Sequence, residues 1–523
     1  MNSLDSQQQN ISSGSHLSPW TEKSTPLPAT VLQDDFEVDI AIIGGGISGL
    51  TCAYLLSAEG KKVAVFEDGE IGSGESGRTT AHLVTALDDR YYEIEQRHGK
   101  DVALLSARSH AAAISKIEEI VTEHQIECDF KRVPGYLFLH PSDKPENLEK
   151  ELQATQRAGL RTEITDHIPG INHDGKAIVF HDQGQFHIMK YLNGLAKLIT
   201  SNGGQIFTHT HIDKVEEDRV LTASGRTIKA KYIISATNTP INNLLVLHTK
   251  QHAYRTYVIG GLIEKDSLKP ALWWDTGDQE SEWSTAPYHY VRIAEYNSEF
   301  DLLIVGGEDH KTGQADEEYL KEEDRYRLLE NWAREKFPQW IRMVYSWSGQ
   351  VMEPVDGIAY IGHNPNDSEN IFVVTGDSGN GMTHGTIAGM LITDLIMGRN
   401  NPWKELYDPA RINFRSTKEY LEENLNTFKQ YVDLISPGDI DASDELAPNT
   451  GAIMRHGLTK LAVYKDPEGT VSTFSALCPH LGCVVKWNND EKTFDCPCHG
   501  SRFSCLGKVI NGPANSDLKR ESL

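Results

Sequence analysis

The sequence predicts an α/β domain interleaved with a second, α+β domain and followed by a small all-β domain. Three observations lead to this prediction. A β-branched run at 38–43 precedes a glycine-rich turn and a helical stretch at 50–58. The same order of strand, glycine-rich turn and helix returns at 371–397. Near the carboxy end, the alternating segment 460–464 begins a region with two short loops rich in Cys and His.

Length and composition indicate a globular protein of about three domains. The chain has 523 residues, 39% of them hydrophobic, and domains usually hold roughly 100 to 200 residues. Its net charge is -25, and such a surface repels phosphate backbones and anionic lipid. We therefore expect neither a nucleic-acid partner nor membrane insertion.

The sequence carries no recognisable targeting or membrane segment. No run approaches the roughly 18 apolar residues that a membrane helix needs. The first 36 residues are polar, without the basic start and apolar core of a secretory signal. A cytoplasmic location is therefore the expectation.

The first glycine-rich turn predicts a Rossmann-like dinucleotide site. Gly44 allows the tight turn, Gly46 lets the backbone approach a pyrophosphate, and Gly49 lets helix and strand pack closely. The helix N-terminus would favour the phosphates. Glu67 ends a second strand at 62–66, where a carboxylate can accept both hydroxyls of an adenosine ribose. An acid at this position favours an unphosphorylated ribose, which leaves FAD or NAD.

The second glycine-rich turn favours a flavin over NAD. It follows a buried strand at 371–375 and leads into a helix that we expect to run to about 397. A helix N-terminus aimed at the flavin pyrimidine would stabilise the negative charge that develops there on reduction. By itself, this segment could equally be one more strand-turn-helix unit of an α/β sheet.

The two loops near the carboxy end each offer one thiolate and one imidazole. This is the ligand set of a Rieske [2Fe-2S] cluster, in which Cys478 and Cys496 would hold one iron and His480 and His499 the other. A structural zinc site is the alternative, since two Cys and two His also suit tetrahedral zinc. The first pair here is C-x-H, which fits the usual zinc spacing poorly.

Together, the two turns and the stretch Ser76–His82 resemble the D-amino-acid oxidase superfamily of FAD enzymes, which includes glycine and sarcosine oxidases. With its tail, the chain looks like the bacterial FAD-dependent oxidoreductases that carry a Rieske domain. The resemblance implies FAD contacts from Gly44, Gly46, Gly49 and Glu67 on the AMP side, from Val215 at the adenine, from Arg78, Thr79 and Thr80 near the isoalloxazine, and from Gly376, Gly379, Gly381, Met382 and Thr383 beneath the ring.

The resemblance of the tail extends beyond the four ligands. Cys483 and Cys498 stand where a Rieske domain of the respiratory-complex type has a disulfide that ties the two loops together. Ser501 stands where a hydroxyl donates to a cluster sulfur, which stabilises the more negative reduced state. High-potential members carry a Tyr where this chain has Phe503. We therefore predict a reduction potential below that of those members.

The segment 286–292 alternates like a strand, so we expect Tyr288, Tyr290 and Arg292 to share one face. This face could form an aromatic and cationic wall over the flavin, suited to an amine or to an amino acid carrying a carboxylate. The alternative is a half-buried sheet face. The other residues expected in this wall are Arg255, Tyr257, Tyr136 and Trp347.

Two histidines are candidates for proton removal from the substrate nitrogen, because the resemblance puts His82 and His384 near the flavin. A hydrogen-bonded structural role is the alternative for each. The candidate catalytic residues are thus His82, His384, Arg255 and Tyr288.

We expect four segments: a polar leader at 1–36, an oxidoreductase at 37–411 with discontinuous FAD-binding and substrate subdomains, a helical linker at 412–432, and a Rieske domain at 433–523. The expected work is oxidation of a small amine or amino acid by FAD, with electrons passed through the cluster to an external acceptor. The alternatives are a reductase that runs the same chain inward from an external donor, and an electron-transfer or redox-sensing protein without its own substrate. A Rieske oxygenase is least expected, because no mononuclear iron domain is recognisable after the loops.

Overall fold

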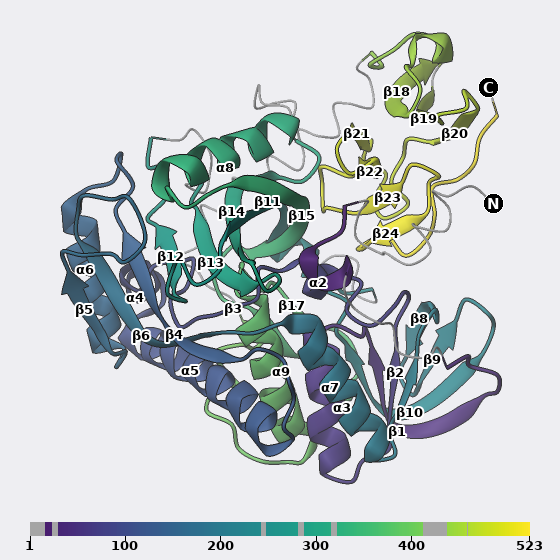
Figure 1. The fold of residues 1–523 in the computed structure, drawn as a ribbon. Helices are drawn as coiled ribbons and strands as arrows, with labels where there is room; N and C mark the ends of the chain where they lie inside the picture. The colour runs from purple at the N-terminus through teal and green to yellow at the C-terminus, as the bar shows by residue number, and fades with distance from the viewer. Residues whose placement is uncertain are drawn as a thin grey trace.

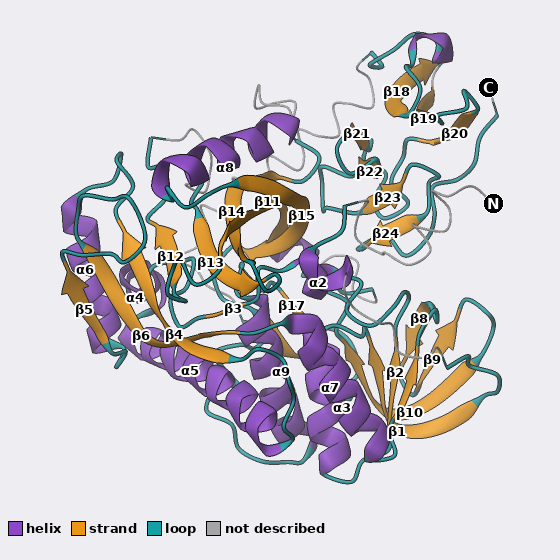
Figure 2. Ribbon diagram, in the orientation of Figure 1, coloured by secondary structure: helices purple, strands orange, loops and turns teal. Residues whose placement is uncertain are grey.

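The computed structural model describes residues 16–22, 30–241, 247–280, 287–314, 322–411, 437–457 and 459–522. The predicted linker at 412–432 and most of the predicted leader at 1–36 lie outside these described residues. The predicted fold class is confirmed: two large sheets with helices form the body, and a separate region of small antiparallel sheets follows (Figures 1 and 2).

The first sheet is the parallel one that the Rossmann-like pattern predicts. β1 pairs in parallel with both β2 and β10, and β10 pairs in parallel with β17. These strands read as continuous apolar runs because helices or loops cover both faces. The order is β16-β17-β10-β1-β2-β7, with β9 on β10 and β8 on β9. The bounds are β1 (Phe36–Ile43), β2 (Val63–Phe66), β7 (Gln205–Phe207), β8 (Ile212–Glu216), β9 (Arg219–Thr222), β10 (Thr227–Ser235), β16 (Tyr360–His363) and β17 (Ile371–Thr375).

Two helices that follow the glycine-rich turns pack directly on each other. α3 (Ile47–Ala58) and α9 (Gly381–Ile396) lie side by side below the turns in Figure 1. Gly389 permits this approach, since a Cβ there would lie 2.5 Å from Thr51 Cγ2. The turns are thereby held at one edge of the sheet. The other helices are α2 (Pro19–Glu22), α4 (Tyr91–His98), α5 (Lys100–Glu123), α6 (Pro145–Arg157), α7 (Ile188–Ser201) and α8 (Glu322–Lys336).

The second sheet has nine strands in the order β15-β11-β14-β13-β12-β4-β6-β3, with β5 on β6. It is antiparallel except where β12 pairs with β4. The predicted strand at 286–292 begins later than expected, because β13 starts at Tyr290 and Tyr288 precedes it. The bounds are β3 (His82–Leu83), β4 (Lys131–Phe138), β5 (Thr162–Thr165), β6 (Ala177–Gln185), β11 (Gln251–Glu264), β12 (Leu272–Asp275), β13 (Tyr290–Glu295), β14 (Phe300–Lys311) and β15 (Arg342–Pro354).

The region after residue 436 is all-β and has its own core. A three-stranded sheet holds β18 (Thr450–His456), β19 (Thr459–Lys465) and β20 (Val471–Ser475), and a four-stranded sheet holds β21 (Lys486–Asn488), β22 (Thr493–Asp495), β23 (Arg502–Ser504) and β24 (Val509–Asn511). The core includes Cys478, Cys496, Phe494 and Phe503. Within the described residues, none of the helices has the length and apolar content to cross a bilayer.

Candidate functional site

A deep cavity lies between the glycine-rich edge of the first sheet and one face of the second sheet. Residues 509–512, 514 and 515 of the all-β region complete its lining, so three parts of the fold enclose one space. Thirteen residues singled out from the sequence line it: Gly44, Gly46, Glu67, Arg78, Thr79, Thr80, His82, Tyr288, Tyr290, Gly379, Gly381, Met382 and His384.

Several residues singled out from the sequence do not line the cavity. Gly49 lies behind the turn, where a Cβ would meet Gly44 O at 1.9 Å. Val215 of β8 is half-buried against the core beside the first sheet, although Ile212 of the same strand lines the cavity. Gly376 and Thr383 support the second turn from outside the lining, and Thr383 Oγ1 donates to Asn380 O at 3.0 Å. Arg255 faces the all-β region instead.

The first turn has the shape that a pyrophosphate requires. Gly44 adopts φ 107°, and a Cβ there would lie 2.4 Å from Ala236 O. Gly46 precedes α3 without a side-chain cap, and a Cβ on it would lie 2.8 Å from Ser76 Oγ. The cradle is therefore open only because these side chains are absent. This geometry fits a phosphate group at the N-terminus of α3.

Glu67 lies at the end of β2 in the cavity lining. Its Oε2 accepts from Gly45 N at 2.6 Å and its Oε1 accepts from Gly69 N at 3.0 Å. Burial raises the pKa of this carboxyl, while the two N–H donors oppose that rise. Each oxygen keeps a second lone pair, so a ribose hydroxyl can still donate to Glu67.

His82 and His384 line the cavity, but both ring nitrogens of each are engaged. His82 contacts Thr80 Oγ1 at 2.9 Å and Val291 O at 3.2 Å. His384 contacts Asp377 O at 2.8 Å and His110 Nε2 at 3.2 Å. Burial lowers the pKa of His82 to about 3, aided by the charge of Arg292, and that of His384 to about 4. These contacts favour the structural alternative for both rings over proton removal.

The expected cationic wall is not formed, because its two arginines point elsewhere. Arg292 is buried and its Nη1 donates to the carbonyls of Thr80, Ala81 and Phe186. Arg255 Nη1 donates to Ser348 Oγ at 3.0 Å. Tyr257, Tyr136 and Trp347 also lie outside the lining. Tyr288 and Tyr290 remain in the lining, together with the carboxyl groups of Asp88 and Asp309.

The Cys and His loops bring the four proposed cluster ligands together in two pairs, Cys478 with Cys496 and His480 with His499. Cys478 and Cys496 are buried, and their side chains are in hydrogen-bonding contact. The rings of His480 and His499 lie 4.9 Å apart at 88°. Among the described residues, nothing hydrogen-bonds to the buried Nδ1 of His499. Burial, with the charge of neighbouring imidazoles, lowers the pKa of His499 to about 3, and a neutral ring is what a metal ligand requires. The donor set therefore fits a [2Fe-2S] cluster.

The two loops are tied together by further contacts. A disulfide joins Cys483 to Cys498. Cys478 N donates to Cys483 O at 2.8 Å, and Cys496 N donates to Ser501 O at 2.7 Å. Ser501 is fully buried, its hydroxyl accepts from Ala514 N at 3.0 Å, and it hydrogen-bonds to the Cys478 sulfur.

The hydrogen bond from Ser501 to the Cys478 sulfur, and the position of Phe503 in the same core, predict how two substitutions change the reduction potential. We expect Ser501→Ala to lower the potential by about 40 mV, because one hydrogen bond to the reduced state contributes roughly 1 kcal/mol. Phe503→Tyr should raise it by a similar amount if its hydroxyl reaches a ligand sulfur. Spectroscopic redox titration of both variants checks this, and shifts in the same direction would contradict it.

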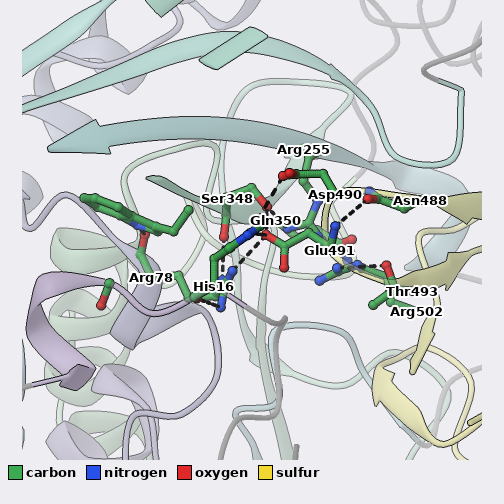
Figure 3. Close-up of polar contacts among 12 residues, drawn as sticks. His16, Arg78, Arg255, Ser348, Gln350, Asn488, Asp490, Glu491, Thr493 and Arg502 are labelled. Atoms are coloured by element: carbon green, nitrogen blue, oxygen red, sulfur yellow. Dashed lines mark hydrogen bonds and ion pairs between the residues drawn. The ribbon is translucent and has the colours of Figure 1, made fainter. Parts of the chain in front are cut away.

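An ion cluster at the junction joins the all-β region to the body (Figure 3). Glu491, 1% exposed at its side chain, pairs with Arg78 at 2.9 Å and accepts from Ser348 Oγ. Arg255 and Arg502 also face it. Burial alone would raise the pKa of Glu491, but the three guanidinium charges outweigh it and hold that pKa at about 2.

Gln350 links the cavity to a cluster loop. This residue of β15 lines the cavity, and its Nε2 donates to Gly500 O at 3.0 Å. Gly500 directly follows His499, one of the proposed cluster ligands. On the other side, the ring of His248 in the 3-10 helix η2 (His248–Lys250) lies 5.1 Å from that of His480. The cluster histidines therefore face the body of the protein.

Sequence reasoning missed Glu491, Gln350 and residues 509–515 as parts of this site. Each lies far along the chain from what it contacts. Glu491 and Gln350 belong to no pattern with a characteristic spacing, and Gly512, Pro513 and Ala514 match the Rieske pattern without indicating a contact with the cavity. The signal that identifies Glu491 is its pairing with arginines that lie far away along the chain, and such pairing cannot be read from one sequence.

Comparison with known proteins supports both the oxidoreductase part and the Rieske part of the chain. Residues 39–395 match the family described as FAD dependent oxidoreductase (DAO), and residues 436–521 match the Rieske [2Fe-2S] domain. A protein of Bacillus subtilis (strain 168), named as a Rieske 2Fe-2S iron-sulfur protein, YhfW, is 32% identical over 508 residues, 96% of each chain.

Two further similarities concern the oxidoreductase part. The gamma-glutamylputrescine oxidoreductase of Escherichia coli (strain K12) is 27% identical over 392 residues, 71% of this chain and 86% of that protein. The crystal structure of glycine oxidase from Geobacillus kaustophilus superposes with a TM-score of 0.58 at 17% identity, covering 72% of this chain and 99% of that one, which shows the shared fold. The chain is a flavin-dependent oxidoreductase that belongs to the FAD dependent oxidoreductase (DAO) family and carries a Rieske [2Fe-2S] domain.

Proposed function

We propose that this protein oxidises a small amine at a C–H bond beside nitrogen and passes the electrons through its Rieske cluster to an external acceptor. The family supports the flavin chemistry, and the Escherichia coli relative is named for an amine substrate. The Rieske domain, which carries the proposed cluster ligands, follows the oxidoreductase part in the same chain. When bound, FAD accepts two electrons as hydride and the [2Fe-2S] cluster carries one electron at a time.

One observation carries this proposal: a single cavity is lined by both glycine-rich turns and by the Rieske domain. Gln350 spans from that cavity to Gly500, and Gly512 packs so closely on Thr239, another lining residue, that a Cβ would lie 2.4 Å from its Oγ1. The side chain of Gln350 thus connects the lining of the cavity to the loop that carries His499. Such an arrangement supports electron exchange within one chain.

The residues of the chain would bind, orient and enclose the substrate. Trp274, Tyr288 and Tyr290 supply ring surfaces at one end of the cavity. The Rieske residues 509–512, 514 and 515 close another side and exclude water. His82 and His384 would position their neighbours, because their nitrogens are already engaged.

The test is anaerobic reduction of purified protein that holds both cofactors. We expect a subset of small primary and secondary amines to bleach the flavin absorption, after which the EPR signal of the reduced cluster should grow without any added mediator. Amines that leave the flavin oxidised throughout would contradict the amine proposal. A bleached flavin beside an EPR-silent cluster would contradict the relay.

The direction of electron flow is a separate question with its own measurement. Outward flow requires the cluster midpoint potential to lie above that of the flavin, and potentiometry of the same sample gives both values. A cluster that lies below the flavin would favour a reductase that runs inward.

A further inference from the structure

One end of the cavity combines aromatic rings with carboxyl groups. Trp274 of β12 and Tyr290 of β13 line it together with Tyr288, and the two tyrosine rings lie 5.4 Å apart. Asp309 of β14 and Asp88, from the loop before α4, lie in the same lining. Asp88 hydrogen-bonds to the Tyr288 hydroxyl. Ring faces and carboxylates are the two surfaces that attract an ammonium ion.

Two acceptor atoms at this cavity lack a donor within the described part of the chain. Asp309 Oδ1 is buried and makes no hydrogen bond there. Asn380, 6% exposed, lines the same cavity, and its Oδ1 is likewise unsatisfied. A buried acceptor without a donor is costly, so a ligand that brings N–H groups would remove this cost.

The charges around this end are unbalanced in favour of acids. Glu353 and Asp377 also line the cavity near the second turn. Of the two arginines in the lining, Arg78 pairs with Glu491, which leaves Arg90 facing the carboxyls. Burial raises the pKa of Asp88 to about 6 and that of Asp309 to about 7, and the charge of Asp88 adds to the rise at Asp309. A bound cation would relieve this crowding.

The geometry points to a substrate that carries a second cationic group in addition to the amine that is oxidised, as in a diamine. This inference rests on the proposed function and names its substrate class. The distal ammonium would lie among Asp309, Asp88 and the rings of Trp274, Tyr288 and Tyr290, where it satisfies Asp309 Oδ1. A distal carboxylate would meet four lining acids, Asp88, Asp309, Glu353 and Asp377, with Arg90 as the counter-charge in the lining that Glu491 does not pair, because Arg255 and Arg292 are turned away.

Three probes of equal chain length separate this inference from the proposed function: 1,4-diaminobutane, butylamine and 4-aminobutyrate, which differ only in the distal group. Each is titrated anaerobically into the holoprotein, and both the perturbation and the bleaching of the flavin spectrum are followed. We expect 1,4-diaminobutane to bind roughly 10-fold or more tightly than butylamine, as a charge-assisted hydrogen bond predicts, and 4-aminobutyrate to bind most weakly.

The inference is overturned if butylamine or 4-aminobutyrate binds as tightly as the diamine, or if none of the three perturbs the spectrum. Failure of the proposed function has a different signature, in which the diamine binds preferentially but no probe bleaches the flavin. Binding and chemistry are thus read from separate signals.

Asp309→Asn provides the matched variant test. It should remove most of the preference for the diamine while leaving butylamine affinity nearly unchanged, since only the distal group loses its partner. Asp182→Asn, at a side chain 63% exposed on β6, is the control with the same chemical change. Should Asp309→Asn fail to retain FAD, Asp88→Asn is tested in the same way. Equal losses for both amines would overturn the assignment of this end of the cavity to the distal ammonium.

Discussion

Replacing Glu491 by glutamine is expected to destabilise the protein by about 3 to 5 kcal/mol, because it leaves buried guanidinium groups without their counter-charge. Glu491 pairs with Arg78 from the flavin-side loop, and Arg255 and Arg502 face it from either side of the junction. Chemical unfolding monitored by fluorescence gives the free energy. Loss of FAD should accompany it, since Arg78 lines the cavity.

A matched control for this change is Glu521→Gln in the same domain. Glu521 pairs with Lys519, whose side chain is 79% exposed, and exposed pairs contribute about 0 to 1 kcal/mol. If Glu491→Gln unfolds at the same denaturant concentration as this control, the buried ion cluster does not hold the junction.

The same carboxylate makes the junction sensitive to acid. The pKa of Glu491 is held at about 2 in the folded protein, below its unfolded value, so the folded state gains stability from its ionised form above the unfolded pKa. That gain is lost as the pH falls towards 2. Wild-type protein should therefore lose stability more steeply in acid than Glu491→Gln, which has no proton to take up at this site.

Cys496→Ser is expected to abolish the cluster while leaving the flavin chemistry in place. The residue is buried between its loop partners, and a hydroxyl is a poor substitute for a thiolate on iron. Iron content and the EPR signal should fall nearly to zero. An amine that bleaches the wild-type flavin should still do so, but steady-state turnover with a one-electron acceptor should collapse.

Cys505→Ser separates loss of a ligand from loss of packing. Cys505 is buried in the same core, 3% exposed, and is not among the proposed ligands. The Cys505→Ser variant should therefore keep its iron. Retention of turnover in Cys496→Ser without iron would mean that electrons leave the flavin by another route, and the cluster would then have a different role.

The elements around the cofactor sites were predictable because their signals are local. The strand at 371–375 and the glycine-rich turns were placed correctly, since turn geometry demands Gly within a few residues of a buried strand. The cluster loops could be read in the same way, because a metal restricts residue type and spacing over short stretches. Tyr288 was wrongly placed in a strand, because alternation alone cannot tell where pairing begins.

Side-chain roles that depend on distant partners could not be predicted. Arg255 and Arg292 stand at strand positions that would suit a wall of the cavity. The buried carboxylate of Glu491 attracts Arg255, and backbone carbonyls bind Arg292, so neither side chain lines the cavity. His82 and His384 lie at the cavity, but their hydrogen bonds to Val291 and His110 engage ring nitrogens that proton removal would need. In each case the deciding group is far along the chain.

The sequence by itself determined the family, the two cofactors and the fold class, because glycine-rich turns and cluster loops encode their chemistry in neighbouring residues. Only the tertiary structure decided that the Rieske domain contributes to the lining of the cavity, that Glu491 pairs with Arg78 at the junction, and that acids surround Tyr288 and Tyr290. The physical reason is that burial and charge pairing are properties of the folded arrangement, in which residues hundreds of positions apart share one low-dielectric space.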